Sequence, residues 1–163
     1  MKSRNSLIRL KRFQVDEKRR QVMQIEMMIA EFERMGARML SPEEAAKITE
    51  FAFGCGDKVS MDAVGQKAPE LAARAGFSVP PGTKILLAPL PSDLDELAEH
   101  PLVQEKLMPV LGLVRAPDVQ TAIDAAVLVT EHGGLGHTSA IYGDDQSVID
   151  AYALAVRTGR ILV

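Results

Sequence analysis

The chain has 163 residues, and 47% of them are hydrophobic, which is enough for the core of one ordinary domain and an appended segment. Aromatic residues make up 4% and tryptophan does not occur, so we expect an aliphatic core. A single cysteine excludes an internal disulfide, and the basic start lacks the apolar run and cleavage site of a secretory signal. No apolar run reaches the roughly 18 residues of a membrane span. We therefore expect a soluble, cytoplasmic protein.

The charge is distributed unevenly along the chain, although the formal net charge is only −3. Residues 1–35 hold nine Lys and Arg against five Asp and Glu, a balance of +4. Residues 36–163 hold the remaining ten basic and seventeen acidic residues, a balance of −7. This asymmetry predicts two units, 1–35 and 36–163, that differ in history or in partners.

Residues 1–35 contain neither glycine nor proline and predict one long helix. Its apolar residues recur every seven positions, at Ile8, Val15, Val22 and Ile29, with Ile25 and Phe32 three residues after the last two. Lys11 and Lys18 take the first two places of that second series, so the apolar seam is strong only in its second half. A solvated amphipathic helix and a two-stranded coiled coil both fit. Interleaved acids without an aromatic platform argue against nucleic-acid binding.

From residue 36 onward, helix and strand signals alternate. Ser41, with Pro42 next and Glu44 three residues on, predicts a capped helix that stops at Gly54. The further expected elements are a helix at 68–76, a turn at 80–82, strands at 83–90 and 109–116, a helix at 118–134, a strand at 138–143, a helix at 144–159 capped by Asp144 or Asp145, and a strand at 160–163. This order predicts an α/β fold, a three-layer α/β/α sandwich whose parallel or mixed sheet carries helices on both faces.

Two nucleophile patterns are weak when judged by their neighbours. Cys55 is the only thiol, but no basic residue or helix N-terminus beside it would lower its pKa, which favours a structural cysteine. His137 and Ser139 are two residues apart and lack a third, orienting group nearby, which argues against a catalytic dyad.

The glycines of residues 133–136 follow a helix and precede a strand. A dinucleotide-binding loop has the reverse order, so we exclude a phosphate loop here. Glu105 lies among apolar residues and prolines before a buried strand, and both a surface charge and a ligand-facing carboxylate remain open for it. His100, His132 and His137 do not show metal-ligand spacing, so we expect no metal site.

Most of the second unit resembles a known enzyme family. The segments that carry the resemblance occur in the family's order and spacing; they are "AGFSVPPGTKILLAPL", "HPLVQEKLMPVLGLVRAPD", "GGLGHTSAIY" and "TGRILV". They resemble the aldehyde dehydrogenase superfamily and are most similar to its CoA-acylating branch, which acts on acetaldehyde or propionaldehyde. The resemblance covers about residues 36–163 and implies part of a Rossmann-like catalytic domain.

The resemblance also implies a chemistry and its residues. In this family a cysteine thiolate attacks the aldehyde, NAD accepts the hydride, and CoA accepts the acyl group. Glu105 matches the glutamate that hydrogen-bonds the nicotinamide ribose, and His137 matches an accessory histidine near the reaction centre. Cys55 does not match the nucleophile, whose position in the family lies upstream of residue 36. We therefore expect an inactive fragment that binds neither cofactor well and self-associates through uncovered sheet edges.

Residues 1–35 resemble a different family, the flagellar export protein FliJ, a small helical coiled-coil protein that works against the export ATPase ring. This resemblance implies an alternative function, an interaction protein that contacts export ATPase components through its N-terminal helix. A third interpretation is a gene-fusion relic without a function, joined near residues 35 and 36.

Overall fold

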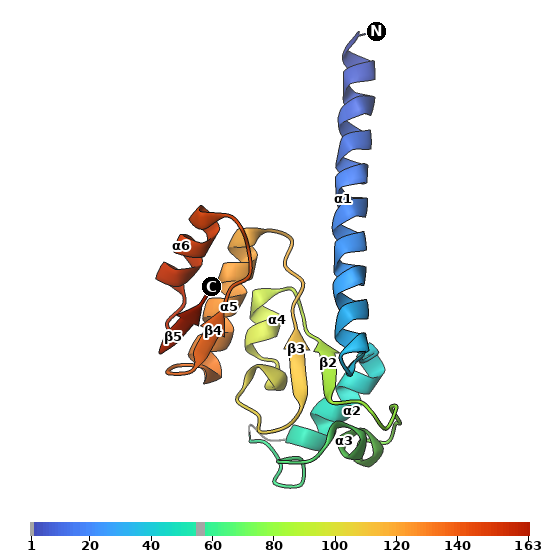
Figure 1. The fold of residues 1–163 in the computed structure, drawn as a ribbon, viewed down its shortest axis with the longest axis vertical. Helices are drawn as coiled ribbons and strands as arrows, with labels where there is room; N and C mark the ends of the chain where they lie inside the picture. The colour runs from blue at the N-terminus through green and yellow to red at the C-terminus, as the bar shows by residue number, and fades with distance from the viewer. Residues whose placement is uncertain (1, 55–57) are drawn as a thin grey trace. The chain divides into compact units, whose positions relative to one another are not determined.

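The computed structural model describes residues 2–54 and 58–163, so Cys55 lies outside the described residues. The chain divides into two compact units, Met1–Ala37 and Arg38–Val163 (Figure 1).

The first unit is the single long helix α1, Lys2–Arg34, which confirms the helix predicted for residues 1–35. The turn that follows it contains Gly36, whose φ of 101° is a left-handed conformation that glycine adopts without a steric penalty. The apolar seam residues Val15 and Val22 are exposed in the single chain. Among the described residues, none of the helices combines the length and apolar character that crossing a membrane requires.

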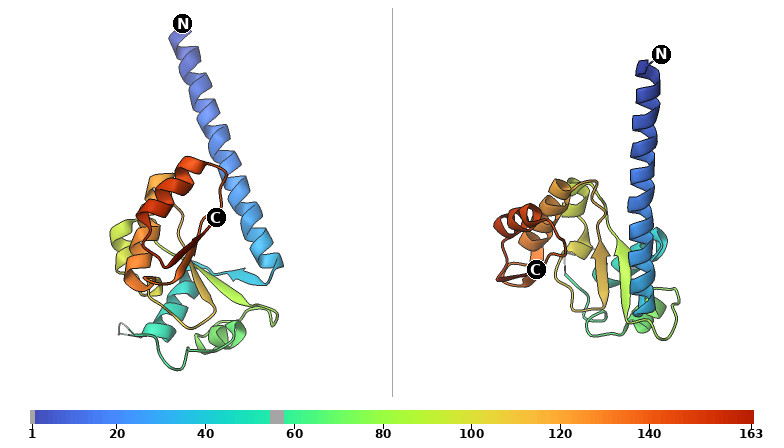
Figure 2. Two further views of the ribbon diagram at one scale, coloured as in Figure 1. Left: turned by 60° about the vertical axis from the view of Figure 1, so that its left-hand side comes forward. Right: turned by 45° about the horizontal axis from the view of Figure 1, so that its top comes forward.

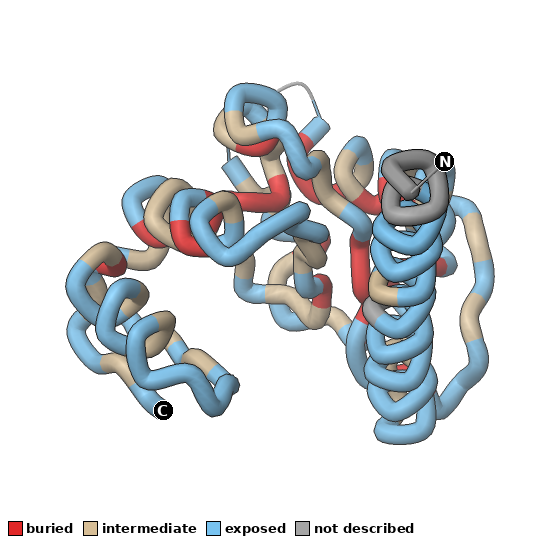
Figure 3. Tube along the Cα trace, turned by 90° about the horizontal axis from the view of Figure 1, so that it is seen from above, coloured by how far each residue is buried: buried red, intermediate tan, exposed pale blue. Residues whose placement is uncertain are grey.

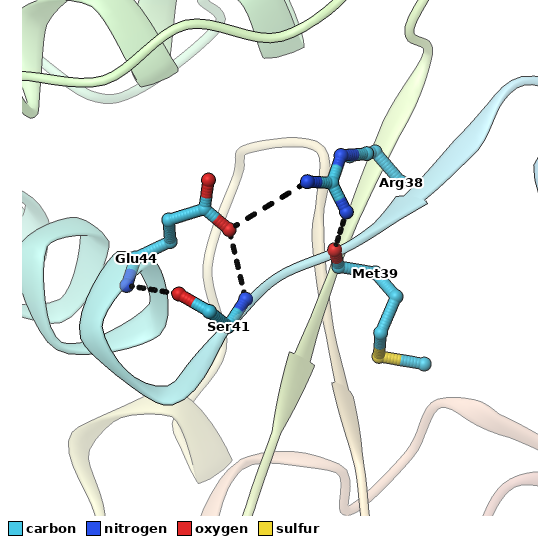
Figure 4. Close-up of polar contacts among 4 residues, drawn as sticks. All are labelled: Arg38, Met39, Ser41 and Glu44. Atoms are coloured by element: carbon cyan, nitrogen blue, oxygen red, sulfur yellow. Dashed lines mark hydrogen bonds and ion pairs between the residues drawn. The ribbon is translucent and has the colours of Figure 1, made fainter.

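Helix α2, Pro42–Phe53, begins with the predicted capping box (Figure 4). The Ser41 hydroxyl accepts a hydrogen bond from the amide of Glu44 at 3.1 Å, and the Glu44 carboxylate accepts one from the amide of Ser41 at 2.8 Å. The same carboxylate lies 4.0 Å from the guanidinium of Arg38, which also donates to the carbonyl of Met39. Arg38 belongs to strand β1, Ala37–Met39, so these contacts connect the first strand to the helix that follows it.

The main sheet has the strand order β1-β2-β3, with β2 at Ile85–Pro89 and β3 at Val110–Leu113. Strands β2 and β3 are parallel, and Leu86 pairs with Val110. Helices α2 and α3, Ala68–Arg74, contribute to the core on one face of this sheet. The core contains side chains from both helices and both strands: Ile48, Ala52, Leu71, Leu86, Ala88 and Val110.

A second apolar cluster lies beside the ends of β2 and β3. It joins α4, Leu94–Ala98, the 3-10 helix η1, Pro101–Val103, and α5, Val119–Gly133. Its buried members are Leu97, Val103 and Ala125, with Leu90 and Val114 packed against them. Helices on two sides of the main sheet therefore confirm part of the predicted three-layer arrangement (Figure 2).

The last two predicted strands do not join the main sheet. β4, Thr138–Ala140, and β5, Arg160–Leu162, pair in parallel with each other as a separate two-stranded sheet. Helix α6, Gln146–Ala155, connects them and is capped by Asp145. The prediction of one sheet was therefore wrong, because the residue pattern identifies strands but not the strand beside which each one lies. Residues of this C-terminal segment are mostly exposed, whereas the buried ones concentrate in the main sheet and its helices (Figure 3).

Candidate active site

The two site residues indicated by the family resemblance meet in the structure, although they are far apart in the sequence. Glu105 follows η1 on the segment that leads into β3, and His137 lies between α5 and β4. The Nε2 atom of His137 is 3.7 Å from the Oε1 atom of Glu105, within ion-pair distance when the imidazole is protonated. Both side chains remain more than half exposed, at 57% for His137 and 59% for Glu105. The pair is therefore accessible to a ligand.

A close backbone approach brings this pair together. A Cβ atom on Gly133, the last residue of α5, would lie only 2.8 Å from the amide nitrogen of Glu105. Any larger residue would collide with backbone, which cannot rotate away as a flexible side chain can. Gly133 therefore lets the end of α5 contact the Glu105 segment, and this explains one glycine of the "GGLG" run.

The turn before β4 fixes the backbone of His137. Gly136 has a φ of 86°, and the amide of His137 donates to the carbonyl of Gly134 at 3.0 Å. From the residue directly before β5, the amide of Gly159 donates to the carbonyl of His137 at 3.0 Å. A Cβ on Gly159 would lie 2.7 Å from the carbonyl oxygen of Gly136, so this contact also requires a glycine. The run is thus a helix stop and a tight turn into a strand, as the sequence predicted.

A cavity of about 290 Å³ lies beside the pair. Its polar and charged lining comes from the segment before β3, the end of α5, strand β4 with the turn before it, and the segment before β5: Gln104, Glu105, Lys106, Thr130, His137, Thr138, Ser139 and Thr158. The hydroxyls of Ser139 and Thr158 lie 3.2 Å apart and form a hydrogen bond. Thr158 is therefore the hydrogen-bond partner of the Ser139 hydroxyl, and the argument against a dyad of Ser139 with His137 stays a prediction.

Lys106 restrains the segment between η1 and β3. Its Nζ atom donates to the carbonyl of Leu102 at 2.7 Å, and burial lowers the pKa of Lys106. His100 accepts a hydrogen bond from the amide of Leu102 at 3.2 Å. Burial, and secondarily the charge of Lys106, lowers the pKa of His100. These contacts restrain the backbone that carries Glu105.

The sequence did not indicate that Thr158 lines the cavity. Thr158 becomes a neighbour of Ser139 only because β4 pairs with β5. The sequence also did not indicate that Gly133 lies against the backbone of Glu105. Within the part of the chain that the structure describes, no three His, Cys, Asp or Glu side chains gather as metal ligands.

The chain is similar in sequence and structure to parts of several larger dehydrogenases. An aldehyde-alcohol dehydrogenase of Clostridium acetobutylicum is 40% identical over 136 residues, which are 82% of this chain and 15% of the relative. The solved structure of an acetylating aldehyde dehydrogenase from Geobacillus thermoglucosidasius matches with a TM-score of 0.75 at 32% identity, over 85% of this chain and 30% of that one. A propionaldehyde dehydrogenase of Rhodopseudomonas palustris with bound propionyl-CoA matches with a TM-score of 0.71 at 26% identity, over 86% of this chain and 30% of that one.

The chain thus spans less than a third of the length of these proteins. No protein-family model matches the chain, so the resemblance of residues 1–35 to FliJ, and the export ATPase partners it implies, stays a prediction. The homologues and structural neighbours that cover most of this chain are acylating aldehyde dehydrogenases.

Proposed function

We propose that the unit Arg38–Val163 contributes the Glu105–His137 wall of the active site of an acylating aldehyde dehydrogenase, which converts an aldehyde to an acyl-CoA. The observation that carries this proposal is the 3.7 Å approach of the two side chains beside one cavity. These two exposed polar side chains lie where a Cβ on Gly133 would come within 2.8 Å of the amide nitrogen of Glu105.

Glu105 suits the ribose of a nicotinamide cofactor. An ionised carboxylate has two acceptor oxygens and no donor, which matches the two hydroxyl donors of a ribose. The Glu105 side chain is 59% exposed and lines the cavity, so those oxygens are available to a ligand. NAD supplies the hydride acceptor when it is bound, and the role of Glu105 is to hold and orient it.

His137 suits a proton-handling and orienting role. A histidine titrates near neutral pH and can accept a proton or donate one. The Oε1 atom of Glu105 lies 3.7 Å from its Nε2, so the carboxylate stands beside the ring. In this proposal His137 positions the aldehyde or assists transfer of the acyl group to CoA. Neither Cys55 nor Ser139 is given the role of nucleophile.

We further propose that the 163 residues alone do not oxidise aldehydes and bind NAD and CoA weakly. Covalent catalysis needs an activated nucleophile beside the bound cofactor, and the resemblance assigns that nucleophile to none of the residues 36–163. Incubation of the purified chain with propionaldehyde, NAD and CoA should therefore produce no NADH.

A chimera tests the proposed role directly. We would insert residues 38–163 in place of their structural counterpart in the Geobacillus enzyme, which this chain matches over 85% of its own length. The chimera should form acyl-CoA. Glu105→Gln should raise the KM for NAD about tenfold, because a neutral amide is a weaker acceptor for the ribose. His137→Ala should lower kcat by about 10²-fold with little effect on that KM.

Two neighbouring residues provide matched controls. Glu131 and His132 are exposed on α5, outside the cavity lining, so Glu131→Gln and His132→Ala should leave both constants unchanged. A folded chimera whose activity survives Glu105→Gln and His137→Ala would overturn the proposed roles. Turnover by the 163-residue chain that depends on Cys55 would overturn the assignment of the nucleophile.

A further inference from the structure

Helix α1 carries an apolar seam that is open to solvent. We define the α1 seam as the apolar residues at the two heptad positions between residues 15 and 32: Val15, Val22, Ile25, Ile29 and Phe32. Val15 and Val22 are 49% and 53% exposed, and Ile25 and Phe32 are both 38% exposed. Two adjacent apolar rows of this kind are the pattern by which a helix pairs with another helix.

The edge of the seam carries charges of opposite sign at its two ends. Four exposed charged residues recur every seven positions along this edge: Arg12, Arg19, Glu26 and Glu33. Each directly follows a residue of the heptad row formed by Lys11, Lys18, Ile25 and Phe32. The ion pairs found among the described side chains of α1 are Asp16–Arg19, Glu17–Arg20 and Glu31–Arg34. Of the edge residues, Arg19 alone takes part, at a distance of 3.9 Å. The edge is therefore basic in its first half and acidic in its second half.

These charges decide which orientation of a second helix fits. In a parallel pair identical positions face each other, so Lys18 would meet Lys18 inside the seam, and the charged edge would not meet its own copy. In an antiparallel pair related by a two-fold axis between Val22 and Ile25, each charged edge lies against the same edge of the other helix. Arg12 then faces Glu33, and Arg19 faces Glu26.

The same register also matches the apolar rows. Val22 faces Ile25 of the second copy, and Val15 faces Phe32. Lys18 lies opposite Ile29, where its long aliphatic stem can pack while its ammonium reaches water. The same antiparallel register therefore brings apolar residues together in the seam and opposite charges together along its edge.

We propose that residues 12–33 of α1 form an antiparallel helix pair with the same residues of a second copy of this chain. The pairing accounts for an exposed seam and for a charge order that is self-complementary only when one helix is reversed. It does not depend on the aldehyde dehydrogenase role of the second unit.

Charge reversal tests the edge contacts in the full chain. Sedimentation equilibrium should find a dimer of the wild type, and Arg12→Glu with Arg19→Glu should weaken it about tenfold or more, because each attractive contact becomes a repulsion and occurs twice by symmetry. Glu26→Arg with Glu33→Arg should weaken it similarly. An equimolar mixture of the two double variants should recover the dimer, since an all-acidic edge then faces an all-basic one.

A control separates these contacts from net charge. Arg9→Glu with Arg20→Glu makes the same change in charge at positions outside the edge, and should leave the dissociation constant within about twofold of the wild type. Circular dichroism confirms that each variant keeps its helix. A monomeric wild type at about 100 μM, a concentration at which a pair with micromolar affinity would be mostly dimeric, would overturn the proposal, as would a control that weakens the dimer equally.

Cysteine cross-linking tests the orientation. With Cys55→Ser, the variant Val15→Cys should form no disulfide with itself, because its two copies would be separated by about 26 Å along an antiparallel pair at about 1.5 Å of rise per residue. Mixed with the variant Phe32→Cys, it should give a heterodimer disulfide. A Val15→Cys homodimer disulfide would show a parallel pair and overturn the antiparallel arrangement.

Discussion

The second unit has two parallel strand pairs, β2–β3 and β4–β5, that differ in how deeply their strands are buried. In β2 the residues Leu86, Leu87 and Ala88 are at most 2% exposed, because helices pack against the strand pair β2–β3. In β4 and β5 the central residues are half-buried and the outer ones exposed, and α6 has no buried residue. A strand is recognisable from its own residues, but its burial depends on the layers that cover it.

The candidate site lies at the junction of these two strand pairs. Glu105 precedes β3 of the buried pair, and His137 precedes β4 of the exposed pair. Large apolar side chains of the second pair and its connections remain open to solvent, with Tyr142 at 94% and Leu154 at 88% exposure. We therefore expect the β4–β5 segment to open first and to carry His137 with it.

The largest expected effect is a difference in the free energy of unfolding between two variants, each of which truncates one apolar residue in one of the strand pairs. Leu86→Ala in β2 should reduce the free energy of unfolding by about 2–5 kcal/mol, because Leu86 is fully buried and its removal leaves a cavity. Ile161→Ala in β5 is the matched change at a half-buried site and should reduce it by about 1 kcal/mol or less. Urea denaturation followed by circular dichroism measures both. Equal losses would contradict the contrast between the strand pairs.

An intermediate effect is expected at the contact that joins the two strand pairs. Gly133→Ala places a methyl group 2.8 Å from the amide nitrogen of Glu105. Alanine favours the helix by about 1 kcal/mol over glycine, but the clash with backbone should exceed this gain and leave a net loss of about 1–3 kcal/mol. Thermal unfolding measures the difference.

Gly143 provides the control for that substitution. A Cβ there meets nothing within 4 Å, so Gly143→Ala should be neutral or slightly stabilising. Hydrogen exchange of the Glu105 amide should accelerate in Gly133→Ala and stay unchanged in Gly143→Ala. Unchanged exchange in both variants would mean that the two segments do not depend on this close approach.

The smallest expected effect is a dependence on pH from His100. Burial lowers the pKa of His100 in the folded chain, so below its ordinary value of about 6.5 the unfolded chain binds a proton more readily than the folded one. Stability should therefore fall as the pH drops through about 6.5. His100→Asn keeps an acceptor for the amide of Leu102 without titrating, and should flatten this dependence. Urea midpoints at about pH 7.5 and 5.5 test it.

The features predictable from the sequence are those whose contacts are local. The Ser41–Glu44 capping box, the Asp118 cap of α5 and the stop of α3 at Gly76 each depend on groups a few residues apart. Strand β1 and helix α4 were missed, because elements of three and five residues have too few positions to show a periodicity. Asp93 signalled the start of α4, since its carboxylate accepts hydrogen bonds from the amides of Asp95 and Glu96.

The sequence by itself thus determined the five described helices of seven residues or more, the capping box of α2, the aliphatic core and the candidate residues Glu105 and His137, the last two through a family resemblance. Only the tertiary structure decided that β4 and β5 form their own sheet and that these two side chains lie 3.7 Å apart. The physical reason is distance along the chain. A cap or a helix stop gains its free energy from adjacent residues, whereas strand pairing and the approach of Gly133 to Glu105 depend on how distant segments pack.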